Sequence, residues 1–85
     1  MSIRVEQTPN PNALKFSVGK PVGGPGTVVR GAETGEEFLA DLLELDGVAS
    51  VFFTADFVTI SKTPDGSWDV ITPEASAILE GHFGD

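Results

Sequence analysis

The strongest constraint on the fold is the alternation of apolar and polar residues in two pairs of neighbouring segments. In the first pair, residues 3–7 alternate, and residues 13–18 place Leu14, Phe16 and Val18 on one face. In the second pair, residues 48–53 and 57–62 follow the same period of two, which places Ala49 on the same face as Val51 and Phe53. This period is typical of strands with one buried face, and the short break within each pair predicts an antiparallel hairpin.

The break inside the first hairpin is the segment Thr8-Pro9-Asn10-Pro11-Asn12. Two prolines remove two backbone donors and hold the preceding residues away from the helical region, and asparagine favours turns. The segment therefore predicts a rigid turn. Two roles remain open: the turn is a preorganised surface for peptide recognition, or the Asn side chains cap it internally.

Helical spacing follows the hairpin. Thr34 and Glu37 fit a capping box, and an apolar stripe comes next, formed by Phe38, Leu39, Leu42, Leu43 and Leu45. Gly47 is expected to end this helix. A second helix is expected to begin with Thr72 as N-cap and Pro73 at the first position, and to fray early at Gly81 and Gly84.

Shorter signals complete the order of elements. Residues 27–30 predict a short third strand, and the Gly- and Pro-rich residues 19–26 predict a flexible connector. Pro64-Asp65-Gly66 predicts a turn in which Gly66 is left-handed. Trp68, Val70 and Ile71 are expected to extend the sheet or cover the edge of the core. The prediction is a single domain over residues 1–85: an α+β two-layer sandwich, ββ(β)αββα, with a mainly antiparallel sheet of four to five strands and two helices on one face.

Composition excludes several functions. The 85 residues include 5 Lys and Arg against 13 Asp and Glu, a net charge of −8, which argues against nucleic acid and anionic membrane surfaces as partners. No apolar run exceeds three residues, so no membrane-spanning segment is expected, and we infer a cytoplasmic location. With 0 cysteines, the chain has no disulfide and no thiolate ligands for a metal or cluster.

The charge is distributed unevenly along the chain. Residues 1–30 contain four cations and one acid, whereas residues 31–85 contain one cation and twelve acids. Such a bipolar surface suits docking, and the alternative is that one end simply carries fewer acids. Four acids of the first helix, Glu36, Glu37, Asp41 and Glu44, are interpreted as a solvated face, with partner binding as the alternative.

No catalytic or metal-ligating arrangement is predicted. Gly19-Lys20 is followed by Pro21 and by no helix, so the phosphate-binding loop pattern is incomplete. His82 is the only imidazole and has no orienting partner at helical spacing, which favours a structural or solvent-facing side chain. We therefore expect no enzyme activity and no bound cofactor.

Phe52, Phe53 and Phe57 flank the turn of the second hairpin. Adjacent strand residues point to opposite faces, so Phe52 and Phe53 cannot both enter one core. Core packing is expected for at least two of these three phenylalanines, and a remaining one is free to meet a partner.

Several motifs resemble those of one known family. Thr8-Pro-Asn-Pro-Asn-Ala-Leu-Lys-Phe16, Gly47-Val48, Ser50-Val-Phe-Phe53 and Asp56-Phe-Val-Thr-Ile-Ser-Lys62, followed by Trp68 and Pro73, are similar to the amino-terminal domain of the Nfu/NifU-like iron–sulfur scaffold proteins. The likeness covers residues 5–80. Two departures are the Thr54-Ala55 turn, where Gly-Pro is common in the family, and the glycine-rich residues 19–26.

In two-domain Nfu proteins, a Cys-x-x-Cys motif in a separate carboxy-terminal domain holds the cluster. The resemblance therefore implies a stand-alone, non-catalytic accessory module whose partners are proteins, including those of iron–sulfur cluster assembly. We expect a monomer or weak oligomer. The expected contact residues are Thr8, Pro9, Asn10, Pro11, Asn12, Lys15, Phe16, Phe53, Asp56 and Phe57.

Three other functions remain open from the sequence. One is a peptide or phosphopeptide binder that uses an anion-receptive strip of Arg4, Lys15, Lys20 and Arg30. Another is a small-molecule binder, which needs a concave pocket. The last is an oligomeric carrier that holds iron through oxygen ligands.

Overall fold

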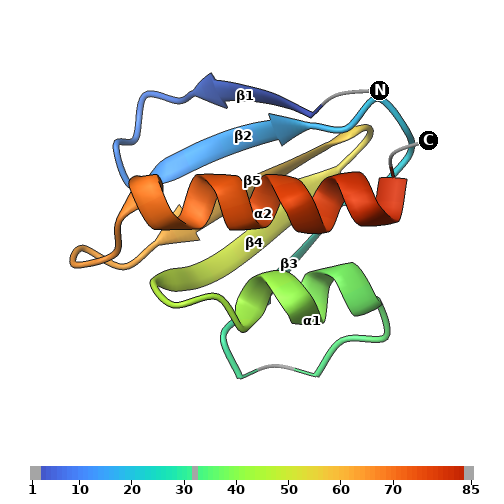
Figure 1. The fold of residues 1–85 in the computed structure, drawn as a ribbon. Helices are drawn as coiled ribbons and strands as arrows, with labels where there is room; N and C mark the ends of the chain where they lie inside the picture. The colour runs from blue at the N-terminus through green and yellow to red at the C-terminus, as the bar shows by residue number, and fades with distance from the viewer. Residues whose placement is uncertain (1–2, 32, 84–85) are drawn as a thin grey trace.

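The computed structural model describes residues 3–31 and 33–83 and shows the predicted two-layer α+β sandwich (Figure 1). The elements are β1 (Arg4–Gln7), β2 (Ala13–Ser17), β3 (Gly26–Val29), α1 (Glu37–Leu43), β4 (Val48–Thr54), β5 (Phe57–Lys62) and α2 (Trp68–Phe83). The five strands form one sheet in the order β1-β2-β5-β4-β3, and every neighbouring pair is antiparallel. Both predicted hairpins are confirmed.

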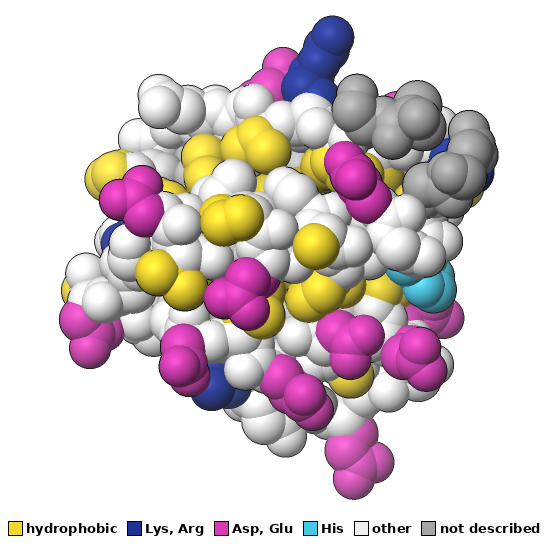
Figure 2. Space-filling view, viewed as in Figure 1, with side chains coloured by type: hydrophobic (Ala, Val, Ile, Leu, Met, Phe, Trp, Pro, Cys, Tyr) yellow, Lys and Arg dark blue, Asp and Glu magenta, His cyan; other side chains and the backbone are white. Residues whose placement is uncertain are grey.

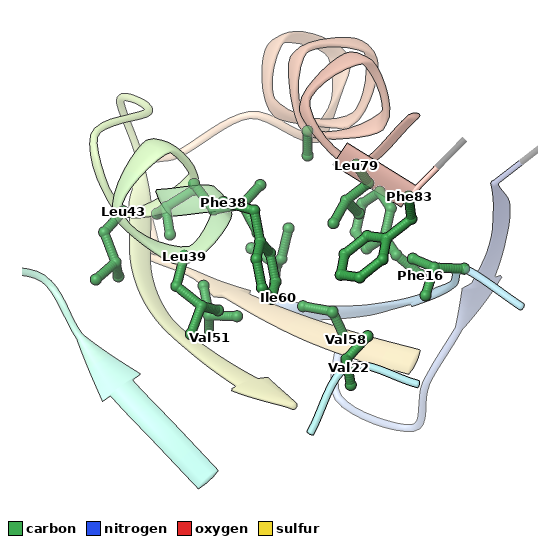
Figure 3. Close-up of a cluster of buried hydrophobic side chains, with 14 of the residues drawn as sticks. Phe16, Val22, Phe38, Leu39, Leu43, Val51, Val58, Ile60, Leu79 and Phe83 are labelled. Carbon is green, nitrogen blue, oxygen red and sulfur yellow. The ribbon is translucent and has the colours of Figure 1, made fainter. Parts of the chain in front are cut away.

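The core lies between the sheet and the two helices, which cover the same face (Figure 1). Alternate strand residues such as Phe16, Val58 and Ile60 are fully buried and meet Leu39 of α1 and Leu79 of α2 (Figure 3). The opposite sheet face carries no helix. The alternation in the sequence is therefore the physical consequence of one covered and one uncovered face.

The connector between β2 and β3, which was expected to be flexible, is anchored at its middle. Val22 is buried in the core cluster, and its backbone N–H donates to the carbonyl of Ala55 at 2.8 Å. Val18, just before the connector, donates in the same way to Asp56 at 2.9 Å. One apolar residue and two backbone hydrogen bonds thus hold this glycine-rich segment against the β4–β5 turn.

The start of α1 differs from the predicted capping box. Thr34 accepts a hydrogen bond from the Glu36 N–H at 3.2 Å, Glu36 is the N-cap, and no side chain caps the helix. The buried apolar stripe is confirmed for Phe38, Leu39, Leu42 and Leu43. Burial of Phe38 and Leu39 therefore sets where α1 begins, since tertiary packing commonly outweighs a cap.

Gly47 does not end α1 as expected, because Glu44 is already the C-cap. Gly47 instead has φ +91° in the turn before β4, and it packs backbone to backbone against Gly66. Gly66 does form the predicted turn, donating its N–H to Thr63 at 3.0 Å, but it has no positive φ. Because Gly66 has no side chain, its backbone can pack closely against that of Gly47.

Strand β4 contains an irregularity that the alternation did not predict. Its register with β5 shifts between Val48 and Ser50, so that Val48 and Val51 are both fully buried. The predicted inward position of Ala49 is therefore wrong. β4 has one extra residue at this β-bulge, so two of its residues lie opposite one residue of β5. Val48 and Val51 therefore both face the core.

The second helix begins earlier than predicted, at Trp68, so Trp68, Val70 and Ile71 do not extend the sheet. Ser67 precedes it and accepts hydrogen bonds from the N–H groups of Val70 at 3.1 Å and Ile71 at 2.9 Å. Pro73 consequently lies inside the helix. Burial of Ile71 stabilises this first turn although Pro73 cannot donate to the turn before it.

At its other end, α2 continues through Gly81 to Phe83, so the predicted early fraying is not seen there; Gly84 lies outside the described residues. Phe83 is buried against the core. No helix in the described part of the chain is long and apolar enough to cross a membrane.

Candidate functional site

The turn between β1 and β2 is held by its own side chains. The Thr8 hydroxyl lies 2.9 Å from the carbonyl oxygens of both Asn10 and Ala13 and accepts from the Asn10 N–H at 3.2 Å. The Asn10 side-chain oxygen accepts from the Asn12 N–H at 2.9 Å. The turn is therefore preorganised by internal hydrogen bonds, because Thr and Asn side chains commonly bond to nearby backbone groups.

Two longer contacts fix this turn to the rest of the fold. The Lys62 ammonium donates to the Asn12 side-chain oxygen at 2.9 Å and to the Thr63 carbonyl at 3.3 Å. The Trp68 indole N–H donates to the Pro11 carbonyl at 3.0 Å. The Asn10 oxygen thus caps the turn internally, as one of the two alternatives expected, whereas the Asn12 oxygen ties the turn to Lys62.

A shallow pocket of ≈ 260 Å³ opens where the turn, the end of β1 and the start of α2 meet. Its lining residues are Gln7, Thr8, Pro9, Asn10, Pro11, Ala13, Leu14 and Trp68. None of them is titratable at neutral pH, and the proline rings, Leu14 and the indole provide apolar surface. We define this feature as the Trp68 pocket. Its lining suits binding of an apolar or proline-containing segment better than acid–base chemistry.

The structure places half of the expected contact residues together and separates the others. Thr8, Pro9, Asn10 and Pro11 line the Trp68 pocket, and Asn12 adjoins it in the same turn. Phe16 is fully buried and is therefore unavailable to a partner. Because Ala13 pairs with Ser61 and Ser17 pairs with Phe57, the β4–β5 turn lies at the opposite end of the sheet. The hairpin residues Phe53, Asp56 and Phe57 therefore belong to a different surface.

The three phenylalanines of the second hairpin correct another expectation. Phe52 is 39% exposed on the uncovered sheet face, whereas Phe53 packs against the core cluster. Phe57 lies on the uncovered face beneath Lys15, whose ammonium is 4.4 Å from the ring centroid. Only Phe53 therefore packs against the core, not two of the three. Lys15 also lies 3.8 Å from the Glu6 carboxylate.

The predicted anion-receptive strip is not assembled. Arg4 lies on β1 and Lys15 on β2, but Arg30 follows β3 at the opposite edge of the sheet. The Arg30 guanidinium donates to the carbonyls of Leu45 at 2.8 Å and Val48 at 3.1 Å. These contacts give Arg30 a structural role far from the first hairpin.

The remaining candidates lie on the helical face. Glu36, Glu37, Asp41 and Glu44 are all exposed, as expected for a solvated helix face. His82 is exposed, with its ring centroid 4.9 Å from that of Phe38. Within residues 3–31 and 33–83, no three His, Asp or Glu side chains gather closely enough to hold a metal ion.

Four pocket residues were not among the expected contact residues: Gln7, Ala13, Leu14 and Trp68. Leu14 was assigned to the core face of its strand, and Trp68 was expected to extend the sheet or cover the edge of the core. The distance of 57 residues along the sequence concealed the contact.

Replacing Asn12 with Ala should lower the free energy of unfolding by about 1–2 kcal/mol, since Lys62 loses its closest hydrogen-bond acceptor. Urea denaturation followed by circular dichroism measures the change. Asn12→Asp retains an acceptor oxygen and should stay close to the parent protein. Equal stability of Asn12→Ala and the parent would show that the Lys62 contact does not hold the turn.

The comparisons with known proteins agree with this architecture. The family model described as "Scaffold protein Nfu/NifU N terminal" matches residues 3–85. A crystal structure of protein SAV1430 from Staphylococcus aureus superposes with a TM-score of 0.79 at 28% identity, covering 94% of this chain and 100% of that one. The solution structure of SeR13 from Staphylococcus epidermidis has a TM-score of 0.66 at 28% identity, covering 96% of this chain and 98% of that one.

Curated relatives are longer proteins. NifU-like protein 4, mitochondrial, of Arabidopsis thaliana is 43% identical over 93% of this chain and 29% of its own length. The NFU1 iron-sulfur cluster scaffold homolog, mitochondrial, of Drosophila erecta is 42% identical over 98% of this chain and 31% of its own length. This chain thus spans less than a third of either relative. Both relatives are named as mitochondrial, which contradicts the cytoplasmic location inferred from the sequence.

Proposed function

Because this chain belongs to the Nfu/NifU N-terminal domain family, we propose that it is a non-catalytic interaction module that serves iron–sulfur cluster assembly through protein contacts. One observation carries the proposal. The family's scaffold fold is present in a chain with 0 cysteines, so thiolate ligation of a cluster falls to a partner. The link to iron–sulfur assembly rests on the relatives named as cluster scaffolds.

The Trp68 pocket is the contact surface in this proposal. Its turn is fixed by hydrogen bonds that the Thr8 hydroxyl and the Trp68 indole donate and that the Asn10 side-chain oxygen accepts, so little conformational entropy is lost when a partner binds. Pro9 and Asn10 are exposed beside it, and Trp68 offers part of its ring. Rigid aromatic and proline surfaces of this kind commonly supply most of the binding energy at an interface.

Trp68 also provides the readout, since it is the only tryptophan in the sequence. We expect a purified Nfu-type domain with a Cys-x-x-Cys motif to shift the Trp68 indole N–H signal of the isotope-labelled chain in a nuclear magnetic resonance titration. The shifts should cluster around residues 7–14 and Trp68. A titration to saturation that leaves the indole signal and this turn unmoved would refute the pocket as the contact surface.

A double variant tests the same surface without disturbing its hydrogen bonds. Gln7 and Pro9 are exposed and line the pocket, so Gln7→Ala with Pro9→Ala should weaken binding about tenfold while the fold is retained. Thr27→Ala with Pro21→Ala removes one exposed polar and one exposed proline side chain elsewhere, and serves as the matched control. Equal weakening by the two pairs would place the contact away from the Trp68 pocket.

A further inference from the structure

A second groove lies between the two helices, away from the Trp68 pocket. It has a volume of ≈ 260 Å³ and is lined by Glu37, Phe38, Asp41, Ala77, Ile78, Gly81 and His82. Figure 2 shows hydrophobic side chains between the helices, acidic side chains along the α1 side and the histidine at one end. We call this feature the interhelical groove.

The floor of the interhelical groove is apolar and firmly held. The Phe38 ring is 99% buried and lies 4.9 Å from the rings of both His82 and Phe83, centroid to centroid. Ile78 is partly buried and packs against the core cluster from α2. The apolar surface that a ligand can reach is provided by Ala77 and Ile78, and the buried Phe38 beneath them holds it in place, which lowers the cost of binding.

Gly81 has no structural reason to be glycine. It lies inside α2, its φ is not positive, and a Cβ built on it would meet nothing within 4 Å. Glycine in a helix interior costs about 1 kcal/mol relative to alanine. Without a side chain at this position, the α2 wall of the groove stays open opposite Glu37 and Asp41.

The rim determines which kind of ligand fits. Glu37 and Asp41 are exposed on the α1 side, and none of the seven lining residues is Lys or Arg. The whole chain carries a net charge of −8, so the surrounding field also favours cations. An apolar floor beside an acidic rim complements a segment in which Lys or Arg flanks an apolar side chain.

We propose that the interhelical groove docks a basic amphipathic segment of a partner protein. An apolar side chain of that segment packs on Ala77 and Ile78, above the buried Phe38, and its flanking cations pair with Glu37 and Asp41. A second copy of this chain is the poorer occupant, because two copies at −8 repel each other. In addition, Lys15, Arg30 and Lys62 already contact groups of their own chain.

The test uses a twelve-residue amidated peptide of Lys and Leu at helical spacing, with fluorescence anisotropy for affinity and isotope-edited spectra for location. Glu37→Gln with Asp41→Asn should weaken binding about fivefold, whereas Glu36→Gln with Glu44→Gln, which removes the same charge from α1 outside the groove, should change it less than about twofold. Shifts should concentrate at Phe38, Ile78, Gly81 and His82.

A steric variant separates the groove from general attraction to acidic surface. Gly81→Gln places an uncharged side chain in the groove and should weaken binding about tenfold, while Gly35→Gln, at another open glycine, should leave it unchanged. Thermal unfolding confirms that both variants fold. Three outcomes would each overturn the proposal. The first is an equal loss of affinity in the two charge variants, and the second is unchanged peptide binding by folded Gly81→Gln. The third is a self-dimer that dissociates on Glu37→Gln.

Discussion

Replacing Phe16 with Ala is expected to lower the free energy of unfolding by about 3–5 kcal/mol. Phe16 is fully buried on β2, where it pairs with Val58 across the sheet and belongs to the core cluster beneath the helices. Truncation removes its transfer free energy and leaves a cavity that the strands cannot close. A domain of this size is stable by only about 4–13 kcal/mol, so the loss is a large share of the total. Urea denaturation measures it.

Phe52→Ala is the matched control for this prediction. It makes the same truncation on β4, but the side chain is 39% exposed on the uncovered sheet face. The expected loss is about 1–2 kcal/mol, smaller than for Phe16, because less apolar surface is buried and no enclosed cavity is left behind. If the two variants unfold at the same urea concentration, the assignment of covered and uncovered faces is incorrect.

Replacing Gly47 with Ala is expected to lower the free energy of unfolding by about 2–4 kcal/mol. Gly47 has φ +91°, a left-handed conformation that costs other residues about 1–2 kcal/mol. A Cβ there would also lie 3.0 Å from the Gly66 Cα and 3.2 Å from the Ile71 Cδ1. The turn before β4 would have to move away from the turn before α2.

Two further glycines separate the conformational cost of the Gly47→Ala change from the steric cost. Gly31 has φ +88° with open space around it, so Gly31→Ala should show the conformational cost alone, about 1–2 kcal/mol. Gly35 has neither a positive φ nor a close neighbour, so Gly35→Ala should be neutral or slightly stabilising. Thermal unfolding of the three variants should rank Gly47 as the most sensitive position. A Gly47→Ala loss no larger than that of Gly31→Ala would show that contact with Gly66 is unimportant.

The predicted contact residues of the first turn lie together, whereas those of the second hairpin lie at the other end of the sheet. Residues 8–12 could be singled out because two prolines and two asparagines indicate a fixed turn in any context. Joining Phe53, Asp56 and Phe57 to that turn required the register of β2 against β5, which puts the two hairpin turns at opposite ends of the sheet. Strand register depends on which side chains reach the core, so the local alternation of apolar and polar residues does not predict it.

The start of α2 likewise depends on long-range contacts that local sequence signals do not indicate. Thr72-Pro73 is a strong local start signal, yet the helix begins at Trp68. Burial of Ile71 and the hydrogen bond from Trp68 to Pro11 stabilise an extra turn that no local rule predicts. The contact with Pro11 also creates the pocket, so the same tertiary interaction decided both the helix start and the candidate site.

The sequence by itself determined the strands, the buried faces, the two-layer architecture and the absence of thiolate ligands. Each of these depends on residue type and period, which are local properties. Only the tertiary structure decided that Trp68 lies against the first turn, that Val48 replaces Ala49 in the core, and that Gly47 approaches Gly66. These outcomes arise from contacts between segments far apart in the chain, where packing energy outweighs the preferences of each segment.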